Sequence, residues 1–200
     1  MKFRGAEAIV ETIEWNDQKV VSKTRNKRGY RHPVLEKKLV KERLRSESRI
    51  IERLISYGVN VPAIYSVDIS NNCIIMEFIE GITLEKALRG NDFEKCLSKT
   101  AQLLSLIHSF NIVHGDPTTS NFMVNEDVYA IDFGLSTVSD DDEDRASDLR
   151  VFLESLDSHH SEISGRNIFL SHYSKWTSSA PVLESLKVLE LRGRYNLMRG

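Results

Sequence analysis

The residues best suited to catalysis lie near the middle of the chain, where residues 112–121 read Ile-Val-His-Gly-Asp-Pro-Thr-Thr-Ser-Asn. Asp116 and Asn121 are five residues apart in this segment, and Asp132 follows 11 residues later in Ile-Asp-Phe-Gly. Phosphoryl transfer needs one carboxylate to orient or deprotonate the acceptor, and an amide and a second carboxylate to hold Mg²⁺ against the phosphates. Either short motif alone is more simply a turn or a strand end. Both together, in this order and at this spacing, favour phosphoryl transfer.

Two antiparallel strand pairs are predicted in the first part of the chain. They cover residues 9–14 with 19–23 and residues 63–67 with 73–78. Both are rich in β-branched residues and are joined by turn-forming residues, Asn16-Asp17 in the first pair and Ser70-Asn71-Asn72 in the second. Between the pairs, Pro33 begins a pattern of helical spacing that ends before Gly58.

The second part of the chain has mainly helical periodicity. The predicted helix starts are Thr83, Asp92, Asp144 and Pro181, and short strand-like pieces cover residues 122–124 and 128–131. Strands with one helix, followed by helices, predict an α+β fold. We expect a strand-rich lobe over residues 1–78 and a mostly helical lobe over residues 79–200.

One residue interrupts the apolar face of the first predicted helix. Glu47 falls at helical spacing between Leu44 and Ile51, where a hydrophobic side chain would normally pack. A carboxylate buried there needs a partner, because an unpaired buried charge is costly. We therefore expect a basic side chain to reach Glu47.

These features together resemble the protein-kinase superfamily. Lys23 ends a Val-Val-Ser-Lys strand, similar to the Val-Ala-Ile-Lys strand whose lysine grips the α- and β-phosphates of ATP. The resemblance makes Glu47 the ion-pair partner of Lys23. It also implies that Asp116 is catalytic and that Asn121 and Asp132 bind Mg²⁺.

The same resemblance assigns further residues to ATP binding and to the support of the catalytic loop. Gly5 and Ala6 stand where the phosphate-covering loop is expected, and Glu77 and Phe78 stand at the hinge that contacts ATP. Asp148, on a later helix, is expected to accept backbone N–H bonds beneath the catalytic loop.

Three departures from the ordinary kinase pattern are informative. No Gly-x-Gly-x-x-Gly precedes the first strand pair, the catalytic loop reads His-Gly-Asp rather than His-Arg-Asp, and no Ala-Pro-Glu follows Gly134. Only 13 residues separate Gly134 from Asp148 and 52 residues follow Asp148, so we do not expect the peptide-docking half of a standard kinase.

This combination is similar to one family in particular, the small atypical serine/threonine kinases of the KEOPS (EKC) complex, which serves threonylcarbamoyladenosine modification of tRNA. The similar segments are residues 5–8, 23–25, 30–35, 45–49, 115–121, 132–136 and 191–194, although the family usually has Leu at Pro117. The resemblance implies ATP hydrolysis or autophosphorylation with Mg²⁺. It also implies binding of the tRNA-modifying catalytic subunit through the helical lobe and of a small subunit through the strand-rich lobe.

Two other functions remain open. Small-molecule kinases of the aminoglycoside or choline type also use His-Gly-Asp and an Asn five residues later, but they add helices for a substrate pocket. A nucleotide-binding scaffold with little turnover would explain the missing glycines, although it would not require every catalytic residue type. Phosphate release from ATP separates a scaffold from an enzyme.

Charge is unevenly distributed along the chain. The formal net charge is −2, but residues 19–49 carry 12 Lys or Arg and 3 Glu, a local charge of +9. This block is either a solvated face or a surface for phosphates, including those of tRNA. The candidate contacts are Lys27, Arg28, Arg31, Lys37, Lys38 and Lys41, with Arg192 and Arg194 near the end of the chain.

The remaining features are expected to be structural. Cys73 and Cys96 have neither zinc-ligand spacing nor the density of a disulfide scaffold, and both should be reduced. The acidic run over residues 140–144 is expected to be a solvated loop, His159-His160 a surface pair, and Tyr173 and Trp176 core residues. No stretch approaches the ~20 apolar residues that span a bilayer. We expect a soluble, cytoplasmic protein, also nuclear if the source is eukaryotic.

Overall fold

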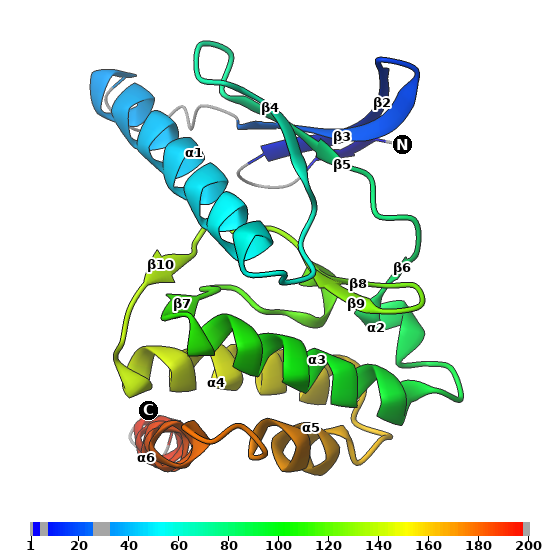
Figure 1. The fold of residues 1–200 in the computed structure, drawn as a ribbon. Helices are drawn as coiled ribbons and strands as arrows, with labels where there is room; N and C mark the ends of the chain where they lie inside the picture. The colour runs from blue at the N-terminus through cyan, green and yellow to red at the C-terminus, as the bar shows by residue number, and fades with distance from the viewer. Residues whose placement is uncertain (1, 5–7, 26–32, 198–200) are drawn as a thin grey trace. The chain divides into compact units, whose positions relative to one another are not determined.

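The computed structural model describes residues 2–4, 8–25 and 33–197, which form two compact units (Figure 1). The first unit contains Met1–Glu80 and Phe133–Leu135, and the second contains Gly81–Asp132 and Ser136–Gly200. The division falls after Glu80, slightly beyond the predicted end of the first lobe. In addition, most of the Asp-Phe-Gly motif groups with the first unit, although it follows strands of the second in sequence.

A five-stranded antiparallel sheet forms the first unit, with the strand order β1-β2-β3-β5-β4. Its strands are β1 (Lys2–Arg4), β2 (Ala8–Trp15), β3 (Gln18–Arg25), β4 (Ile64–Asp68) and β5 (Cys73–Glu77). The helix α1 (Pro33–Ser56) connects β3 to β4 and contacts β4 and β5. Leu44 of α1 packs into a core with Ile74 and Met76 of β5. Both predicted strand pairs and the first helix are therefore confirmed.

The turn between β2 and β3 sets the register of this sheet. It consists of Asn16 and Asp17, whose φ angles are 49° and 59°. Positive φ at both central residues matches the twist of a two-residue hairpin, and Asn and Asp tolerate it better than most residues. The resulting register pairs Lys23 with Val10 of β2 and with Ile74 of β5. Lys23 therefore lies on a central strand, not at a sheet edge.

The second unit consists of helices and two small sheets. Its helices are α2 (Leu84–Ala87), α3 (Phe93–Ser109), α4 (Asp142–His159), α5 (Gly165–Tyr173) and α6 (Ser179–Leu197), with the 3₁₀ helix η1 (Thr119–Asn121). Its strands are β6 (Ile82–Thr83), β7 (Ile112–Val113), β8 (Phe122–Val124), β9 (Val128–Ala130) and β10 (Thr137–Val138). The sheets have the orders β6-β8-β9 and β10-β7, while α3 packs against α5 and α4 against α6 (Figure 1).

A row of aromatic rings forms the core beneath β8. Phe122 meets Phe152 edge to face, with ring centroids 5.9 Å apart, and Phe152 stacks on Phe169 at 4.2 Å. Phe169 in turn stacks on Tyr173 at 6.3 Å. All four side chains are buried, so β8, α4 and α5 share one packed interior. The predicted core position of Tyr173 is confirmed, whereas Trp176 is only half-buried.

Two helix starts differ from the predictions. Asp141 is the N-cap of α4 and its side chain accepts the Glu143 N–H, so the helix starts at Asp142 rather than at Asp144. The expectation of a solvated loop through residues 140–144 was therefore wrong for its second half. The last helix starts at Ser179 instead of Pro181, because proline is tolerated anywhere in the first turn, where its missing N–H has no intrahelical partner.

Other sequence expectations need smaller corrections. Thr83 and Asp92 occupy N-cap positions as predicted, but neither side chain makes a capping hydrogen bond. His159 is exposed, but His160 is buried, so the pair is not a surface pair. Both cysteines are free thiols. Among the helices of the described ranges, none is long and apolar enough to cross a membrane.

Candidate active site

Asp116 lies in the loop between β7 and η1, and Asn121 is the last residue of η1. The Asn121 amide nitrogen donates to the Asp116 backbone oxygen at 2.8 Å and to its carboxylate Oδ2 at 3.1 Å. The Asn121 backbone oxygen accepts the Ile131 N–H at 2.9 Å, which joins this loop to the end of the β9 segment. The structure therefore brings Asp116 and Asn121 together, and it leaves the Asn121 side-chain oxygen for another ligand.

Asp132 follows Ile131 in a left-handed backbone conformation. Its φ is 64° and its side chain is exposed. An L-residue in this region is strained, and such strain is concentrated at functional positions. Burial raises the pKa of Asp116 above its usual value, and the negative charge of Asp132 raises it further. The two carboxylates thus influence each other electrostatically within the second unit.

Asp148 of α4 supports the backbone immediately before Asp116. Its Oδ2 accepts the His114 N–H at 2.6 Å, and its Oδ1 accepts the Gly115 N–H at 2.8 Å. Gly115 has a φ of 83°, a conformation that glycine adopts without strain. Asp148 is only 2% exposed, so its carboxylate has little contact with water. The two N–H donors stabilise its charge instead.

The His114 ring is a fixed part of the same loop. Its Nε2 lies 3.1 Å from the Ile131 carbonyl oxygen, which can only accept, while its Nδ1 lies 3.4 Å from the Asp116 N–H, which can only donate. A neutral imidazole with its hydrogen on Nε2 satisfies both partners. Burial lowers the pKa of His114, which favours this neutral form. His114 therefore joins the catalytic loop to Ile131 through its ring nitrogens.

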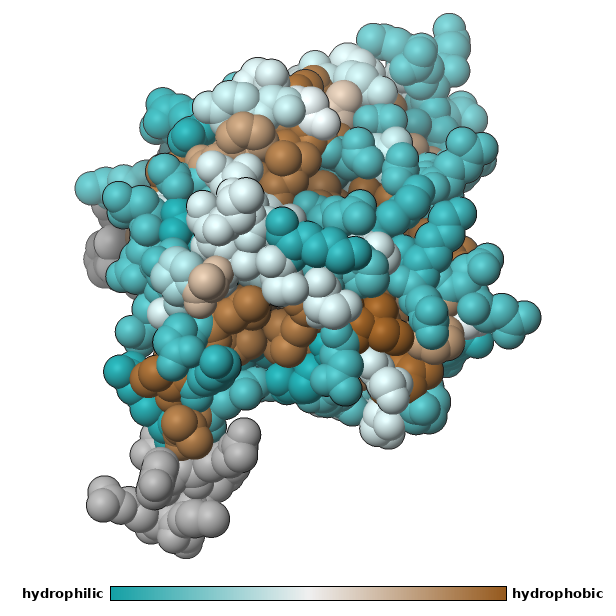
Figure 2. Space-filling view, turned by 60° about the horizontal axis from the view of Figure 1, so that its bottom comes forward, coloured by the Kyte–Doolittle hydropathy of each residue, from teal (hydrophilic) through white to brown (hydrophobic). Residues whose placement is uncertain are grey.

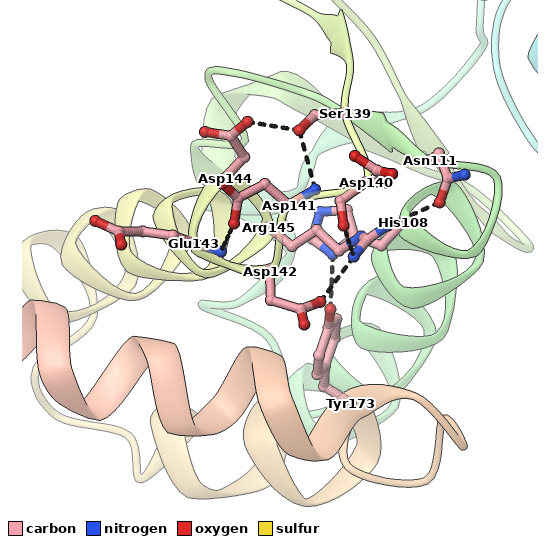
Figure 3. Close-up of polar contacts among 10 residues, drawn as sticks. All are labelled: His108, Asn111, Ser139, Asp140, Asp141, Asp142, Glu143, Asp144, Arg145 and Tyr173. Carbon is pink, nitrogen blue, oxygen red and sulfur yellow. Dashed lines mark hydrogen bonds and ion pairs between the residues drawn. The ribbon is translucent and has the colours of Figure 1, made fainter.

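His108, for which the sequence indicated no role, contacts Asp148 and is held in turn by Tyr173. Figure 3 shows the contact between His108 and Tyr173. The Nε2 of His108, on α3, lies 3.1 Å from Asp148 Oδ2, and its Nδ1 lies 2.7 Å from the Tyr173 hydroxyl. Burial raises the pKa of Tyr173 well above its usual range, so the hydroxyl keeps its proton and donates to His108. Helix α3 thereby contacts the carboxylate of α4 that holds the loop, and α5 holds the contacting His108 in place.

Arg145 of α4 bonds Asn111, the residue directly before β7 (Figure 3). Its Nη2 donates to Asn111 Oδ1 at 2.7 Å, and its Nη1 donates to Asp142 Oδ1 at 2.7 Å and to the Asp140 carbonyl oxygen at 3.0 Å. Asp144 accepts the Ser139 hydroxyl at 2.6 Å. The acidic run is therefore occupied with capping and ion pairing, and within the described ranges no three His, Cys, Asp or Glu side chains gather as a metal site.

The residues expected to grip ATP phosphates lie in the first unit. Lys23 Nζ lies 2.6 Å from Glu47 Oε1, and Arg25 Nη2 lies 2.5 Å from Glu47 Oε2. Glu47 is 1% exposed. The expected basic partner of Glu47 is present, and Arg25 is a second partner that the sequence did not predict. The available signal was the two-residue spacing of Lys23 and Arg25, which places both side chains on one face of β3.

The hinge residues make contacts within the first unit. Glu77 Oε2 accepts the Ala63 N–H at 3.0 Å, and the Glu77 N–H donates to the Ala63 carbonyl oxygen at 2.8 Å. The Lys19 ammonium lies 3.8 Å from the centroid of the Phe78 ring, a cation–π contact. Gly5 and Ala6 lie outside the described residues, and their role stays a prediction.

The predicted tRNA-contacting cations are only partly described. Lys27, Arg28 and Arg31, and the side chains of Lys37 and Arg194, lie outside the described part of the structure. Lys38 is exposed and 3.9 Å from Glu42, and Lys41 is half-buried. Arg192 is exposed and pairs with Glu143 at 3.0 Å.

The donor set fits the Mg²⁺ that the motifs imply. Asp132 and Asn121 offer hard oxygen ligands, which Mg²⁺ prefers. Mg²⁺ usually keeps waters and substrate phosphates in its coordination shell, so one carboxylate and one amide from the protein suffice. These two residues would hold the ion.

Comparison with known proteins identifies the family of this chain. A family model described as the RIO domain matches residues 10–151. The EKC/KEOPS complex subunit bud32 of Dictyostelium discoideum is 35% identical over 204 residues, covering 96% of this chain and 81% of that protein. The KEOPS complex subunit Bud32 of Pyrococcus abyssi is 36% identical over 207 residues, covering 96% and 94%.

Some relatives are much longer than this chain. A probable bifunctional tRNA threonylcarbamoyladenosine biosynthesis protein of Methanococcus vannielii is 38% identical over 194 residues, covering 96% of this chain but 35% of that protein. The chain therefore spans about a third of the length of such bifunctional relatives.

The fold also matches a solved structure. The Rio2 kinase of Chaetomium thermophilum, in an ADP/Mg²⁺-phosphoaspartate complex, superposes with a TM-score of 0.71 at 12% identity, covering 98% of this chain and 70% of that chain. At this identity the likeness concerns the fold alone, and it confirms the predicted α+β, protein-kinase-like architecture. With the matched domain and the relatives of similar length, it follows that the chain belongs to the RIO-domain family and, among its members, to the Bud32 proteins.

Proposed function

We propose that this protein is a Mg²⁺-dependent ATPase and atypical serine/threonine kinase that supports the threonylcarbamoyladenosine-modifying KEOPS complex. The observation that carries the catalytic part is the catalytic loop, in which Asn121 holds the Asp116 carboxylate and Asp148 holds the two preceding backbone N–H groups. A loop held at this many points presents Asp116 in one orientation, which phosphoryl transfer requires of its catalytic carboxylate.

Each residue has a separate task in this proposal. Asp116 orients the acceptor hydroxyl or water and takes up its proton, and its raised pKa makes it a better base than an exposed aspartate. Lys23, held by Glu47, contacts the α- and β-phosphates. Asn121 and Asp132 hold Mg²⁺, which when bound neutralises charge on the phosphates. Glu77 and Phe78 contact the adenine side of ATP, and Gly5 and Ala6 contact its phosphates.

A phosphate-release assay tests the catalytic part. We expect Asp116→Ala to reduce Mg²⁺-dependent ATP turnover about 100-fold or more, because a positioned general base contributes at least this much. Glu126→Ala is a matched control, since this side chain is exposed in the same unit. A folded Asp116→Ala protein that keeps the wild-type rate would reject the assignment and favour the scaffold alternative, in which ATP binds without useful turnover.

The assembly part of the proposal rests on the names of the relatives and on the surface of the second unit. Relatives of similar length are named KEOPS subunits. Figure 2 shows hydrophobic patches among hydrophilic side chains on the face it presents. Exposed apolar side chains of the second unit include Ile82, Leu106, Val138, Val188 and Leu191. These exposed apolar side chains support docking of the tRNA-modifying catalytic subunit on this unit. The proposed position of the small subunit on the first unit rests on the family resemblance alone.

Complex formation can be measured with the purified catalytic subunit by size-exclusion chromatography. We expect Leu191→Glu to prevent co-elution, because it places a charge in an apolar contact on α6. Lys187→Glu is the control on the same helix, since it changes charge without removing apolar surface. Normal co-elution of Leu191→Glu would show that this part of α6 does not bind the subunit. Membership of this complex would place the protein in the cytoplasm, and also in the nucleus of a eukaryote.

Direct tRNA contact through the basic block is a separate part of the proposal. Labelled tRNA should bind the wild type more tightly than a variant with Lys37→Glu, Lys38→Glu and Lys41→Glu, and the difference should shrink as salt increases. Equal affinities at low salt would exclude α1 as a tRNA-binding surface. ATP turnover measured in parallel would detect general damage to the fold.

A further inference from the structure

The Glu47 carboxylate serves two cations, one on each oxygen. Oε1 lies 2.6 Å from Lys23 Nζ, and Oε2 lies 2.5 Å from Arg25 Nη2. The side chains are 7%, 4% and 1% exposed for Lys23, Arg25 and Glu47. All three charges are therefore almost completely removed from water, and the carboxylate is clamped from both sides.

This arrangement matters because the two cations have different chemistry. Lysine carries a compact ammonium on a flexible stem, so it can turn toward another anion, whereas the arginine guanidinium is planar and keeps its charge at any physiological pH. When Lys23 shares its ammonium with a nucleotide phosphate, its hold on Glu47 weakens. A buried carboxylate that lost its only cation would be strongly destabilised. Arg25 on Oε2 prevents this and keeps Oε1 in place.

We propose that Arg25 is a positioning residue for nucleotide binding: it fixes the Glu47 carboxylate so that Lys23 is presented to the phosphates. This inference rests on the proposed role of Lys23 toward ATP. Arg25 itself needs no contact with the nucleotide, because it acts through Glu47. Its backbone is held independently, since it is paired with Ala8 in the sheet and its N–H donates to the Asn72 carbonyl oxygen at 2.9 Å. Replacing the side chain therefore leaves the strand its hydrogen bonds.

A double-mutant cycle on Mg-ATP affinity tests the inference without depending on turnover. The proteins are the wild type, Arg25→Met, Lys23→Met and the double variant, and Mg-ATP binding is measured by calorimetry. If Arg25 acts through the position of Lys23, Arg25→Met weakens Mg-ATP binding about tenfold in the wild-type background but causes little further loss, per folded protein, when Lys23 is already Met. The folded fraction of each variant is measured by circular dichroism, because the double variant leaves the buried Glu47 carboxylate without either cation. Two additive losses, or an unchanged affinity in Arg25→Met, would overturn the proposal.

Two further variants protect the test against misfolding. Arg25→Lys keeps a cation against Glu47 and should recover most of the Mg-ATP affinity, whereas a residue that merely filled space would be replaced better by Met than by Lys. Arg49 is exposed on α1, two residues after Glu47, so Arg49→Met should bind Mg-ATP like the wild type. A Lys variant that binds no better than the Met variant would also overturn the proposal. Failure of the wild type to bind Mg-ATP would instead reject the proposed function itself.

Discussion

The buried Asp148 carboxylate accepts the His114 N–H at 2.6 Å and therefore links α4 directly to the catalytic loop. It also accepts the Gly115 N–H and lies against His108. One side chain thus sets the path of the backbone that leads into Asp116. Removing it would leave several buried donors without an acceptor, and each such donor is costly.

We predict that Asp148→Ala lowers both stability and turnover. Loss of the acceptor should decrease the free energy of unfolding by about 3 kcal/mol, because buried N–H groups would be left unsatisfied. Turnover should fall about 100-fold even in the folded fraction, since a loop displaced by about an ångström no longer presents Asp116 correctly. Urea unfolding and phosphate release measure the two effects.

The control for Asp148 lies on the same helix. Glu154 is exposed and pairs with Arg150 one turn away, so Glu154→Ala should change stability by less than about 0.5 kcal/mol. If Asp148→Ala were as mild as this control, the carboxylate would not be holding the loop.

The hydroxyl of Tyr173 offers a finer test of the same support. Tyr173→Phe keeps the ring in the aromatic row but leaves His108 Nδ1 buried without its partner, which should decrease the free energy of unfolding by about 1–2 kcal/mol. Tyr65→Phe, on the exposed edge strand β4, should have almost no effect. A Tyr173→Phe protein as stable as the wild type would show that the hydroxyl contributes nothing.

The features that the sequence predicted correctly depend on local residue patterns. The features that it missed depend on contacts between residues far apart in the chain. The hairpin at Asn16-Asp17 and the interrupted apolar face at Glu47 depend on neighbouring residues, so they could be predicted. The bond between His108 and Tyr173 joins residues 65 positions apart, and no local pattern indicates it. Burial of His160 was missed for the same reason, because adjacent histidines next to polar residues are typical of surfaces.

His160 should make stability depend on pH. Its ring is 1% exposed, and both ring nitrogens lack a hydrogen-bond partner. Burial lowers the pKa of His160, and the charge of Arg89, which follows α2, lowers it further, against the opposing charges of Glu162 and Glu85. The folded state therefore favours the neutral ring, and stability is lost as the pH falls through about 6.5, where histidine in the unfolded chain gains its proton.

The measurement is a series of melting temperatures between pH 5 and pH 8 for His160→Phe and His159→Gln. His160→Phe should be the more stable protein at pH 5, with a flatter dependence on pH than the wild type, because no buried ring remains to be protonated. His159 is exposed, so His159→Gln should follow the wild-type curve. Parallel curves for wild type and His160→Phe would contradict the prediction.

The charged carboxylate of Asp116 should lower the stability of the fold, although turnover requires it. Because burial and the charge of Asp132 raise its pKa, the charged carboxylate destabilises the fold at every pH above its usual titration range. Asp116→Asn should therefore melt at a higher temperature than the wild type at pH 7, and this difference should vanish as the pH falls below the pKa of the unfolded chain. Turnover by the wild type should decline on the acidic side as Asp116 takes up its proton. A wild type more stable than Asp116→Asn at pH 7 would contradict this assignment.

Two substitutions at Asp132 distinguish the chemical role of its carboxylate from the strain of its left-handed backbone. With a φ of 64°, glycine fits this position without steric cost, whereas alanine does not. Asp132→Gly and Asp132→Ala should both abolish Mg²⁺-dependent turnover, because each removes the proposed anionic ligand of the ion. Asp132→Gly should nevertheless be more stable than Asp132→Ala by about 1 kcal/mol.

At Asp127, which is also exposed but is not among the residues with positive φ, the order of the same two substitutions should be reversed. Equal stability of the two Asp132 variants would mean that this backbone is not strained, while turnover in either of them would remove Asp132 from the metal site.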